Sequence, residues 1–308
     1  MEHRVWFPTL VVAGLLVTLA SSAGTQDSIS LSVTWYPGQP VQGSIMHLVV
    51  DRPGPVTDRD GNTLPVRGTL AGQPLHFEWD GVRSYRALGA VPVNTRESIP
   101  LLLTVADGAG GTADRTIRIP VSPGNFTVEK LRVAPRFAEP PDSALAARIA
   151  AERAQAGAVA RRSHRTPRLW SGEFTLPVAG RVTSRFGEGR EFNDVIQSRH
   201  MGTDLNGVIG TPVKAANRGV VALTGDFYYA GNVVYLDHGR GLMTVYMHLS
   251  QIHVQRGDTV AAGQVIGDVG ATGRVTGPHL HWVARYGRIS VDPLSLARAA
   301  LAAFGPAN

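Results

Sequence analysis

Short runs of apolar and alternating residues, separated by turn sequences, fill the first third of the chain. The runs "SLSVTW", "IMHLVV", "PLHFEW" and "IPLLLTVA" are expected to be strands, and "PGQP", "DRDGN" and "DGAGG" to be turns. Strands at this spacing predict a β-sandwich of immunoglobulin type at residues 24–132. His47 and His76 fall inside these strands, and we interpret both as surface or satisfied core histidines.

An alanine-rich, helix-favouring stretch follows, and it predicts an α-helical linker at residues 133–169. Asp142 or Ser143 can cap the start of the helix, and Leu145 and Ile149 share one face. The stretch ends in a basic cluster of four residues, Arg161, Arg162, Arg165 and Arg168. We expect a solvated helix between two domains. The alternative is a segment that docks on, or shields, a groove of the second domain.

Glycine-punctuated apolar runs return after Trp170. The predicted strands are "PVKAA", "GVVAL", "NVVYLDH", "LMTVYMHL", "TVAAGQVIGDVG" and "HLHWVARY". Short connections between many strands predict a compact, mainly antiparallel β domain at residues 170–308. The expected fold class is therefore mainly β throughout.

The N-terminus has the layout of a secretory signal peptide, assigned to residues 1–23. Positive charge comes first, then the apolar run Val5–Ala20, and then small residues that permit cleavage after Ala23. The apolar run has 16 residues and contains Pro8, whereas a membrane-spanning helix needs about 20 residues. We expect export to the periplasm or cell envelope, with an uncleaved signal as the only membrane link.

Composition narrows the choice of partners. The 308 residues carry a net charge of +6, with an isoelectric point of about 10.0, which suits an acidic partner. Basic residues are not interleaved with aromatic ones, so nucleic acid is not expected. The chain has no cysteine, which excludes a disulfide framework, a cysteine-based zinc site and a thiol nucleophile. We expect a monomer.

The candidate chemistry lies in the last domain. His279 and His281, in "TGPHLHW", are two residues apart on a predicted strand and therefore share a face. "HMGTDL" supplies His200 and Asp204, and "VYMHLS" supplies His248. Hydrolytic zinc sites use three N or O protein ligands and keep a fourth position for water. The set therefore indicates a metal site with additional histidines beside it.

Seven stretches in this domain occur in the order of one known family: "SRFG", "HMGTDL", "GTPVKAANRGVV", "GNVVYLDHG", "YMHLS", "GDTVAAGQVIGDVGATG" and "TGPHLHW". Residues 171 to about 295 resemble the LytM/lysostaphin-type zinc metalloendopeptidases, which are peptidoglycan hydrolases. The resemblance implies one Zn²⁺ per chain, bound by His200, Asp204 and His281. It also implies that His248 and His279 are catalytic.

The function implied by the resemblance is hydrolysis, by zinc-activated water, of peptide bonds in peptidoglycan stem or cross-link peptides. Cross-links through diaminopimelate are preferred to glycine bridges. The alternative is a non-catalytic, peptidoglycan-binding regulator of other wall hydrolases, which the five intact site positions disfavour. The run "GDTVAAGQVIGDVG" also resembles lipoyl and biotinyl carrier domains, but the exposed lysine that those domains need is missing.

Other polar residues lie near the motifs. Some relatives use a tyrosine upstream of the first ligand, but residues 185–199 contain none. Asn193 is an available polar group, and Arg190 is either a contact for a substrate carboxylate or a structural residue. We expect His238 to be structural or to support the site. We expect His164 and His253 to lie on the surface.

Overall fold

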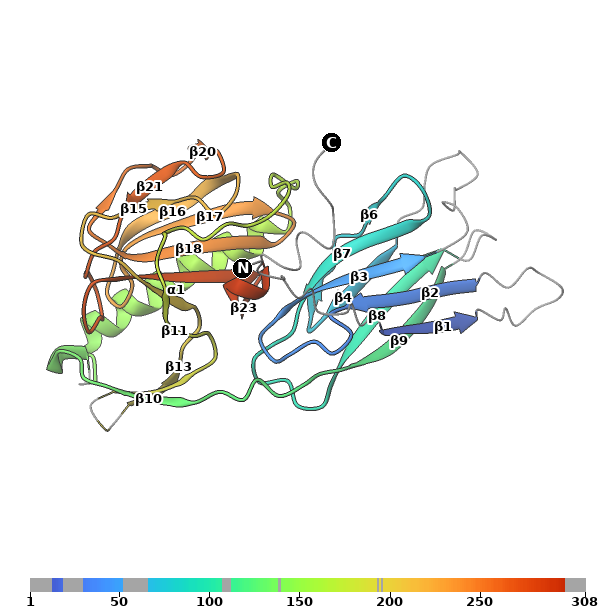
Figure 1. Ribbon diagram of the computed structural model, residues 1–308, viewed down its shortest axis with the longest axis horizontal. Helices are drawn as coiled ribbons and strands as arrows, with labels where there is room; N and C mark the ends of the chain where they lie inside the picture. Colours follow the sequence, from blue (N-terminus) through green and yellow to red (C-terminus); the bar gives the residue numbers. More distant parts are fainter. Residues whose placement is uncertain are drawn as a thin grey trace, which may run out of the picture.

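Two β-rich regions, with one long helix along the second, make up the protein (Figure 1). The computed structural model describes residues 13–18, 30–51, 66–106, 112–137, 140–192, 194 and 196–296. Within these residues the fold is mainly β, as the patterns predict. No helix in the described part of the chain is long and apolar enough to cross a membrane.

The first region consists of two antiparallel sheets around one apolar core. The five-stranded sheet has the order β1 (Ala13–Thr18), β2 (Ser30–Tyr36), β3 (Ile45–Asp51), β7 (Ser84–Ala90) and β6 (Glu78–Trp79). The four-stranded sheet has the order β5 (Gln73–Pro74), β4 (Arg67–Leu70), β8 (Ser98–Ala106) and β9 (Thr112–Pro120). Leu48 from one sheet and Leu101 from the other are both fully buried in the shared core. The assignment to the immunoglobulin type stays a prediction.

Three of the four strands predicted in this region are confirmed, as β2, β3 and β8. The prediction for "PLHFEW" is wrong, because Leu75–Phe77 connect β5 to β6 instead of continuing a strand. The turn sequences "DRDGN" and "DGAGG" lie outside the described residues. Of the predicted signal peptide, only Ala13–Thr18 are described, and they pair along β2.

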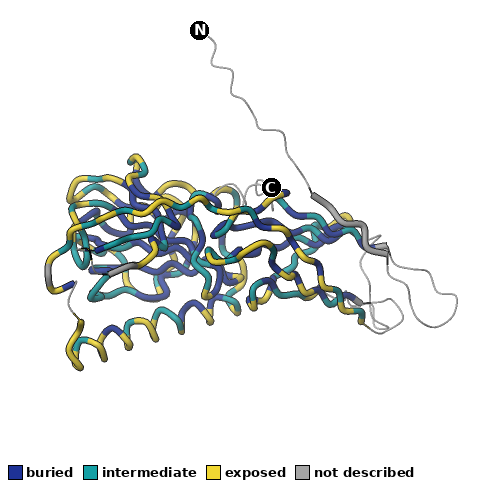
Figure 2. Tube along the Cα trace, turned by 90° about the horizontal axis from the view of Figure 1, so that it is seen from below, coloured by how far each residue is buried: buried dark blue, intermediate teal, exposed yellow. Residues whose placement is uncertain are grey.

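Helix α1 (Ser143–Ser163) follows β10 (Val128–Leu131) along the chain and packs along the second region. Asp142, and not Ser143, is its N-cap, because the Asp142 carboxylate accepts a hydrogen bond from the backbone N–H of Leu145 at 2.8 Å. The prediction of a solvated helix is wrong for its inner side. Ile149 is buried, and Val159 and Ala160 pack into an apolar cluster of the second region. Figure 2 shows exposed residues along its outer side.

The second region is built on an eight-stranded sheet. Its order is β11 (Val182–Ser184), β14 (Thr203–Asn206), β22 (His279–Tyr286), β18 (Leu242–Leu249), β17 (Gly231–Gly239), β16 (Gly219–Phe227) and β20 (Thr259–Val260), with β23 (Ile289–Val291) also paired to β22. A three-stranded sheet contains β15 (Pro212–Lys214), β21 (Val265–Asp268) and β19 (Gln251–Ile252). The predicted strands at 242–249 and 279–286 have the observed bounds.

A second three-stranded sheet covers one end of this region. It has the order β10 (Val128–Leu131), β12 (Gly189–Phe192) and β13 (Ile196–Arg199). β10 pairs parallel to β12, with Glu129 opposite Arg190. A strand within the range predicted for the first domain is therefore added to the edge of the second region, upstream of α1.

The two faces of the eight-stranded sheet bury different residues. Leu280 and Trp282 alternate along β22 with His279, His281 and Val283. Leu280 and Trp282 enter the large apolar core, whereas Val283 joins the cluster under α1. Consequently, α1 and the histidine pair use the same face of the sheet.

Candidate active site

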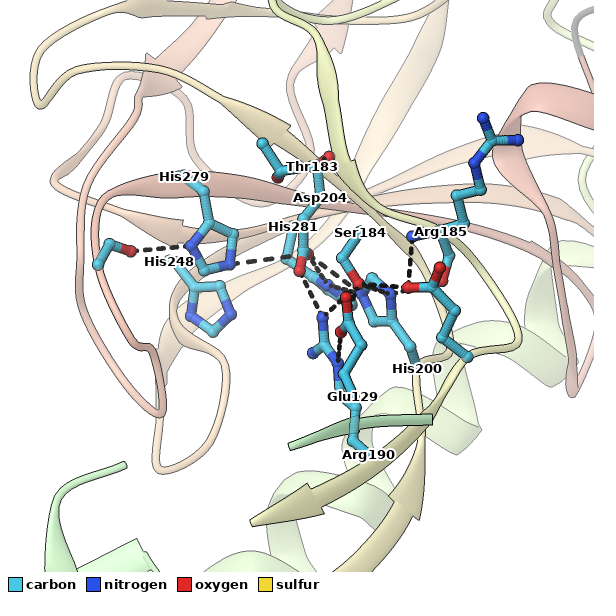
Figure 3. Close-up of polar contacts among 12 residues, drawn as sticks. Glu129, Thr183, Ser184, Arg185, Arg190, His200, Asp204, His248, His279 and His281 are labelled. Atoms are coloured by element: carbon cyan, nitrogen blue, oxygen red, sulfur yellow. Dashed lines mark hydrogen bonds and ion pairs between the residues drawn. The ribbon is translucent and has the colours of Figure 1, made fainter. Parts of the chain in front are cut away.

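Asp204 and His281 meet across the antiparallel pair β14–β22, where they are directly opposite residues. His281 Nδ1 lies 2.7 Å from Asp204 Oδ1. Both side chains are buried, and Figure 3 draws them among the polar contacts of the site. Pairing of the two strands in this register is sufficient to put a carboxylate beside an imidazole, because directly opposite residues point to the same face.

His200 completes the cluster from the segment just after β13. Its Nδ1 lies 2.8 Å from the carbonyl oxygen of Arg185, and a carbonyl can only accept, so that nitrogen carries the proton. The lone pair of Nε2 therefore faces inward, 3.1 Å from Asp204 Oδ1 and 2.9 Å from His281 Nδ1. Gly202 leaves room for the His281 ring, since a Cβ at position 202 would lie 2.7 Å from His281 Nε2.

These three residues fit a metal ion. One donor atom from each of His200, Asp204 and His281 lies within 4.8 Å of the others, and all three residues are buried. Two imidazole nitrogens and a carboxylate oxygen are ligands that zinc and similar divalent metals accept. A cation between them would use the inward lone pairs and offset the buried negative charge.

Asp204 is held in its charged form by its neighbours. Burial raises its pKa, but His281 and His200 outweigh that effect and keep the pKa well below its usual value. Its second oxygen, Oδ2, accepts from Arg190 at 2.5 Å. The two oxygens are therefore divided between the histidines and the guanidinium.

Arg190 belongs to a network of polar contacts that supports the cluster. Of its two interpretations, a substrate contact or a structural residue, these contacts favour the structural one. Besides Asp204, it donates to Ser184 Oγ at 3.0 Å and lies 3.6 Å from the carboxylate of Glu129. Ser184 Oγ also lies 3.1 Å from His200 Nδ1. Figure 3 shows this network on the β10–β12 side of the cluster.

His248 and His279 lie beside the cluster, with their ring centroids 5.0 Å apart. His248 Nδ1 lies 2.8 Å from the carbonyl oxygen of Thr272, and His279 Nδ1 lies 2.8 Å from that of Gly277. Each Nδ1 is therefore the protonated nitrogen, and Nε2 can accept a proton. His279 Nε2 lies 3.6 Å from Asp204 Oδ1.

The backbone of His248 is strained. Its φ is 65°, in the left-handed region that residues with a side chain rarely adopt. A hydrogen bond from its N–H to the carbonyl oxygen of Ala230, at 2.8 Å, supports this conformation. Burial lowers the pKa of His248 well below its usual value, and the neighbouring His281 and His279 act in the same direction. Strain of this kind is frequent where a side chain must be aimed at a functional site.

A cleft of about 260 Å³ opens beside these residues. Asp204, His248 and His279 line one part of it, and Glu129 and Arg190 another. Val133 is the only residue of the predicted linker among those that line it. The described residues of α1 do not line the cleft, so the alternative of a helix over the groove is wrong for this structure.

The other histidines have roles outside the cluster. His238 is fully buried, with Nδ1 2.8 Å from Arg218 O and Nε2 2.7 Å from Thr244 Oγ1, which agrees with a structural role. The surface prediction is wrong for His164, which is partly buried and lies 2.9 Å from His76.

His253 is exposed and pairs with the carboxylate of Asp268 at 2.7 Å, so its surface prediction is confirmed. His47 is buried, and its Nε2 has no hydrogen-bond partner in the described part of the protein. The interpretation of His47 as a satisfied core histidine is therefore wrong for its Nε2 atom. Asn193 lies outside the described residues.

Ser184, Glu129 and Arg274 were not singled out by the sequence patterns. Ser184 falls in "SRFG" and Arg274 in "GATGR", next to recognised stretches, so proximity to a motif was the available signal. No sequence signal pointed to Glu129, because only the parallel pairing of β10 with β12 brings it to the site.

Comparisons with known proteins match the part of the chain that holds this cluster. Residues 198–293 match the model of Peptidase family M23. The chain is 48% identical over 104 residues to the peptidoglycan DD-endopeptidase ShyA of Vibrio cholerae, which covers 33% of this chain and 24% of that protein. It is 45% identical over 98 residues to the DD-carboxypeptidase/endopeptidase Mpg of Neisseria meningitidis, covering 32% of this chain and 23% of that protein.

The matched region thus spans about a quarter of the length of these curated relatives. A longer match is the crystal structure of a peptidase M23 from Pseudomonas aeruginosa, with a TM-score of 0.63 and 29% identity over 85% of this chain and 96% of that chain. The motifs, the His–Asp–His cluster and these matches lead to one conclusion: residues 198–293 are a Peptidase family M23 domain.

Proposed function

We propose that this protein is a zinc-dependent endopeptidase that hydrolyses peptide bonds in the cross-link or stem peptides of peptidoglycan. The observation that carries the proposal is the buried donor set of His200, Asp204 and His281 beside two further histidines in one cleft. The names of the relatives ShyA and Mpg support a bond of the DD type.

The proposed ligands are His200 Nε2, Asp204 Oδ1 and His281 Nδ1. Zinc bound there would supply a Lewis acid that polarises a carbonyl group and activates water. Arg190 holds the other oxygen of Asp204, and Arg185 O fixes the tautomer of His200. Contacts of this kind orient ligands and raise metal affinity.

His248 and His279 are the proposed catalytic residues. Each holds its Nδ1 proton on a backbone carbonyl, which fixes the ring and leaves Nε2 free to take a proton. Because Thr272 O holds the Nδ1 proton of His248, the lone pair of Nε2 would accept a proton from the attacking water and pass it to the leaving amine. A positioned acid–base group typically contributes about 10² to 10⁴-fold to the rate.

Export and assembly are part of the proposal. Residues 1–23 would direct the protein to the periplasm or cell envelope as a signal peptide, with a membrane link only if it is not cleaved. The basic chain, with its charge of +6, would suit an acidic wall. We propose a monomer with an immunoglobulin-like first domain and a helical linker.

The test combines metal content with release of muropeptides from purified peptidoglycan by the mature protein. We expect one zinc per chain and new peptide termini. His281→Ala should lose metal and activity, whereas His248→Ala should keep the metal and lose about 10² to 10⁴-fold in rate. His253→Ala, an exposed histidine outside the site, is the matched control. Zinc without muropeptide release would favour the regulator instead, and the absence of zinc would refute the ligand assignment.

A further inference from the structure

Arg274 lines the same cleft as the histidines. It lies in the connection between β21 and β22, and the cleft is bordered by this residue together with His248, His279 and Asp204. Its backbone N–H donates to Tyr229 O at 2.9 Å. Thr272, two residues earlier, donates its hydroxyl to Leu249 O at 2.9 Å. The loop is therefore anchored at Arg274 and at Thr272, whose carbonyl oxygen also accepts a hydrogen bond from His248 Nδ1.

The guanidinium of Arg274 is fixed between two aromatic rings. Its central carbon lies 4.4 Å from the ring centroid of Phe192 and 4.5 Å from that of Tyr229. Stacking of this kind stabilises a cation and restricts the side chain. With rings close to the central carbon, the donors at the edge of the planar group remain to bind another molecule.

Arg274 differs from Arg190 in its charge partners. Arg190 is paired with Asp204 and Glu129, whereas no carboxylate among the described residues lies within 4.0 Å of Arg274. Burial lowers the pKa of Arg274, and the nearby Arg190 adds to that effect, although Tyr229 opposes it. A partly desolvated cation without an anion is unfavourable. The site would therefore gain from an anion supplied by a ligand.

We propose that Arg274 binds a free carboxylate of the substrate peptide, close to the bond that is cut, and so makes the enzyme prefer acidic peptides. This inference rests on the proposed function, because it takes a peptide as the ligand of the cleft. A carboxylate is the anion that a peptide carries, and the planar edge of a guanidinium matches its two oxygens. Arg274 is thus a specificity-determining residue, the role that the sequence left open for Arg190.

The test uses a cross-linked peptide dimer in two forms, one with its free carboxylates and one with carboxamides in their place. Binding is measured by calorimetry in a zinc-loaded His248→Ala background, so that turnover does not interfere. The values of kcat/KM are measured separately with His248 intact. Arg274→Gln removes the charge, Arg274→Lys keeps it without the fork, and Arg256→Gln is an exposed control. Thermal unfolding and zinc content check that each variant is folded.

We expect the carboxylate form to bind about 10 to 100-fold more tightly than the carboxamide, as one charge-assisted pair would give. Arg274→Gln should abolish that preference and leave carboxamide binding unchanged, and Arg274→Lys should keep part of it. Singly amidated dimers would then identify the carboxylate.

Equal binding of both forms, an equal loss of both in Arg274→Gln, or no binding of either form would overturn the inference. If the preference depends on Arg274 but the protein with His248 intact cleaves nothing, the inference stands and the proposed hydrolysis fails. If cleavage occurs without any preference for the acidic form, the proposed hydrolysis stands and the inference fails.

Discussion

The two β regions differ in what they bury. The shared core of the first region is apolar, and its buried polar residues in the described part are Ser44, His47, Gln73 and Ser84. The second region buries a larger polar set: Ser184, His200, Thr203, Asp204, Asn217, Asp237, His238, Thr244, His248, His281 and Ser295. Burial of a polar group is unfavourable unless it finds partners, so each buried group in the second region requires an explanation.

Two explanations apply to the histidines and aspartates in this set, and the structure separates them. His238 and Asp237 have partners within the fold, which makes them structural. His200, Asp204 and His281 instead direct their donor atoms at one another, an arrangement that only a bound cation would use fully. The difference teaches that convergence of ligand atoms, more than polar burial itself, identifies the functional site.

The largest effect on stability is expected from the apolar region. Leu101 is fully buried between the two sheets, whereas its neighbour Leu102 is 47% exposed. Leu101→Ala should lower the free energy of unfolding by about 2–5 kcal/mol, because it leaves a cavity. Leu102→Ala should change it by less than about 0.5 kcal/mol. Urea denaturation measures both, and metal content should not change in either variant. Equal costs at the two positions would contradict the sandwich core.

The structural polar network of the second region should show the next effect. Asp237 accepts hydrogen bonds from Ser163 Oγ and Thr166 Oγ1, both at 2.7 Å, and from the N–H of Gly239 at 2.8 Å. Asp237→Ala removes the acceptor of these buried and partly buried donors and should cost about 3 kcal/mol.

Asp114→Ala is the matched control for Asp237, since Asp114 is exposed on β9 and accepts from Thr104. Its removal should cost less than about 0.5 kcal/mol by the same denaturation measurement. A comparable loss in the two variants would show that burial of the polar group is not what matters.

Strands with complete patterns could be predicted from the sequence, and long-range pairings could not. "LMTVYMHL" and "HLHWVARY" have the observed strand bounds, and each has β-branched and aromatic residues among its apolar positions. The Ala-rich helix was predictable from propensity, but its packing against β16–β18 depends on the tertiary fold. β9 was missed because only Ile117 and Ile119 are buried apolar residues in its nine positions.

The candidate site follows the same division. The motifs singled out His200, Asp204, His248, His279 and His281, and the structure brings these five together. The supporting residues Glu129 and Arg190 depend on a parallel strand pair between segments far apart in the sequence. A local sequence pattern does not predict such a pairing, so these two residues were identified only from the structure.

Metal affinity should respond to Arg190, which holds the outer oxygen of Asp204. Arg190→Gln should weaken zinc binding by about 10 to 100-fold, since a residue of this kind orients a ligand. Competition with a chelator measures the affinity, with Arg256→Gln as the exposed control. Unchanged affinity would mean that Arg190 only fills space beside Asp204.

Acidification should affect both regions in one pH window. Burial lowers the pKa of His47 in the first region and of His238 in the second from 6.5 to about 4. Both histidines are neutral in the folded protein, so their contribution to stability is complete above pH 6.5 and is lost as the pH falls towards 4. Each should cost up to about 1.4 kcal/mol per pH unit in that window.

Thermal unfolding between pH 7 and 4 tests this expectation. His47→Gln should flatten the profile of the first region, and His238→Gln that of the second. A wild-type profile without a slope in this window would contradict the assignment of neutral buried histidines.

The smallest expected effect is at helix α1, which packs along the second region. Asp142 caps α1 through its bond to the N–H of Leu145, but the helix is also held by the burial of Ile149, Val159 and Ala160. Asp142→Ala should cost about 1 kcal/mol, and Asp142→Asn, which keeps the acceptor, much less. Hydrogen exchange in the first turn of α1 measures this locally. Because α1 does not line the cleft, peptidoglycan hydrolysis should not change in either variant. Increased hydrolysis in Asp142→Ala would instead mean that the helix restrains the enzyme from outside the cleft.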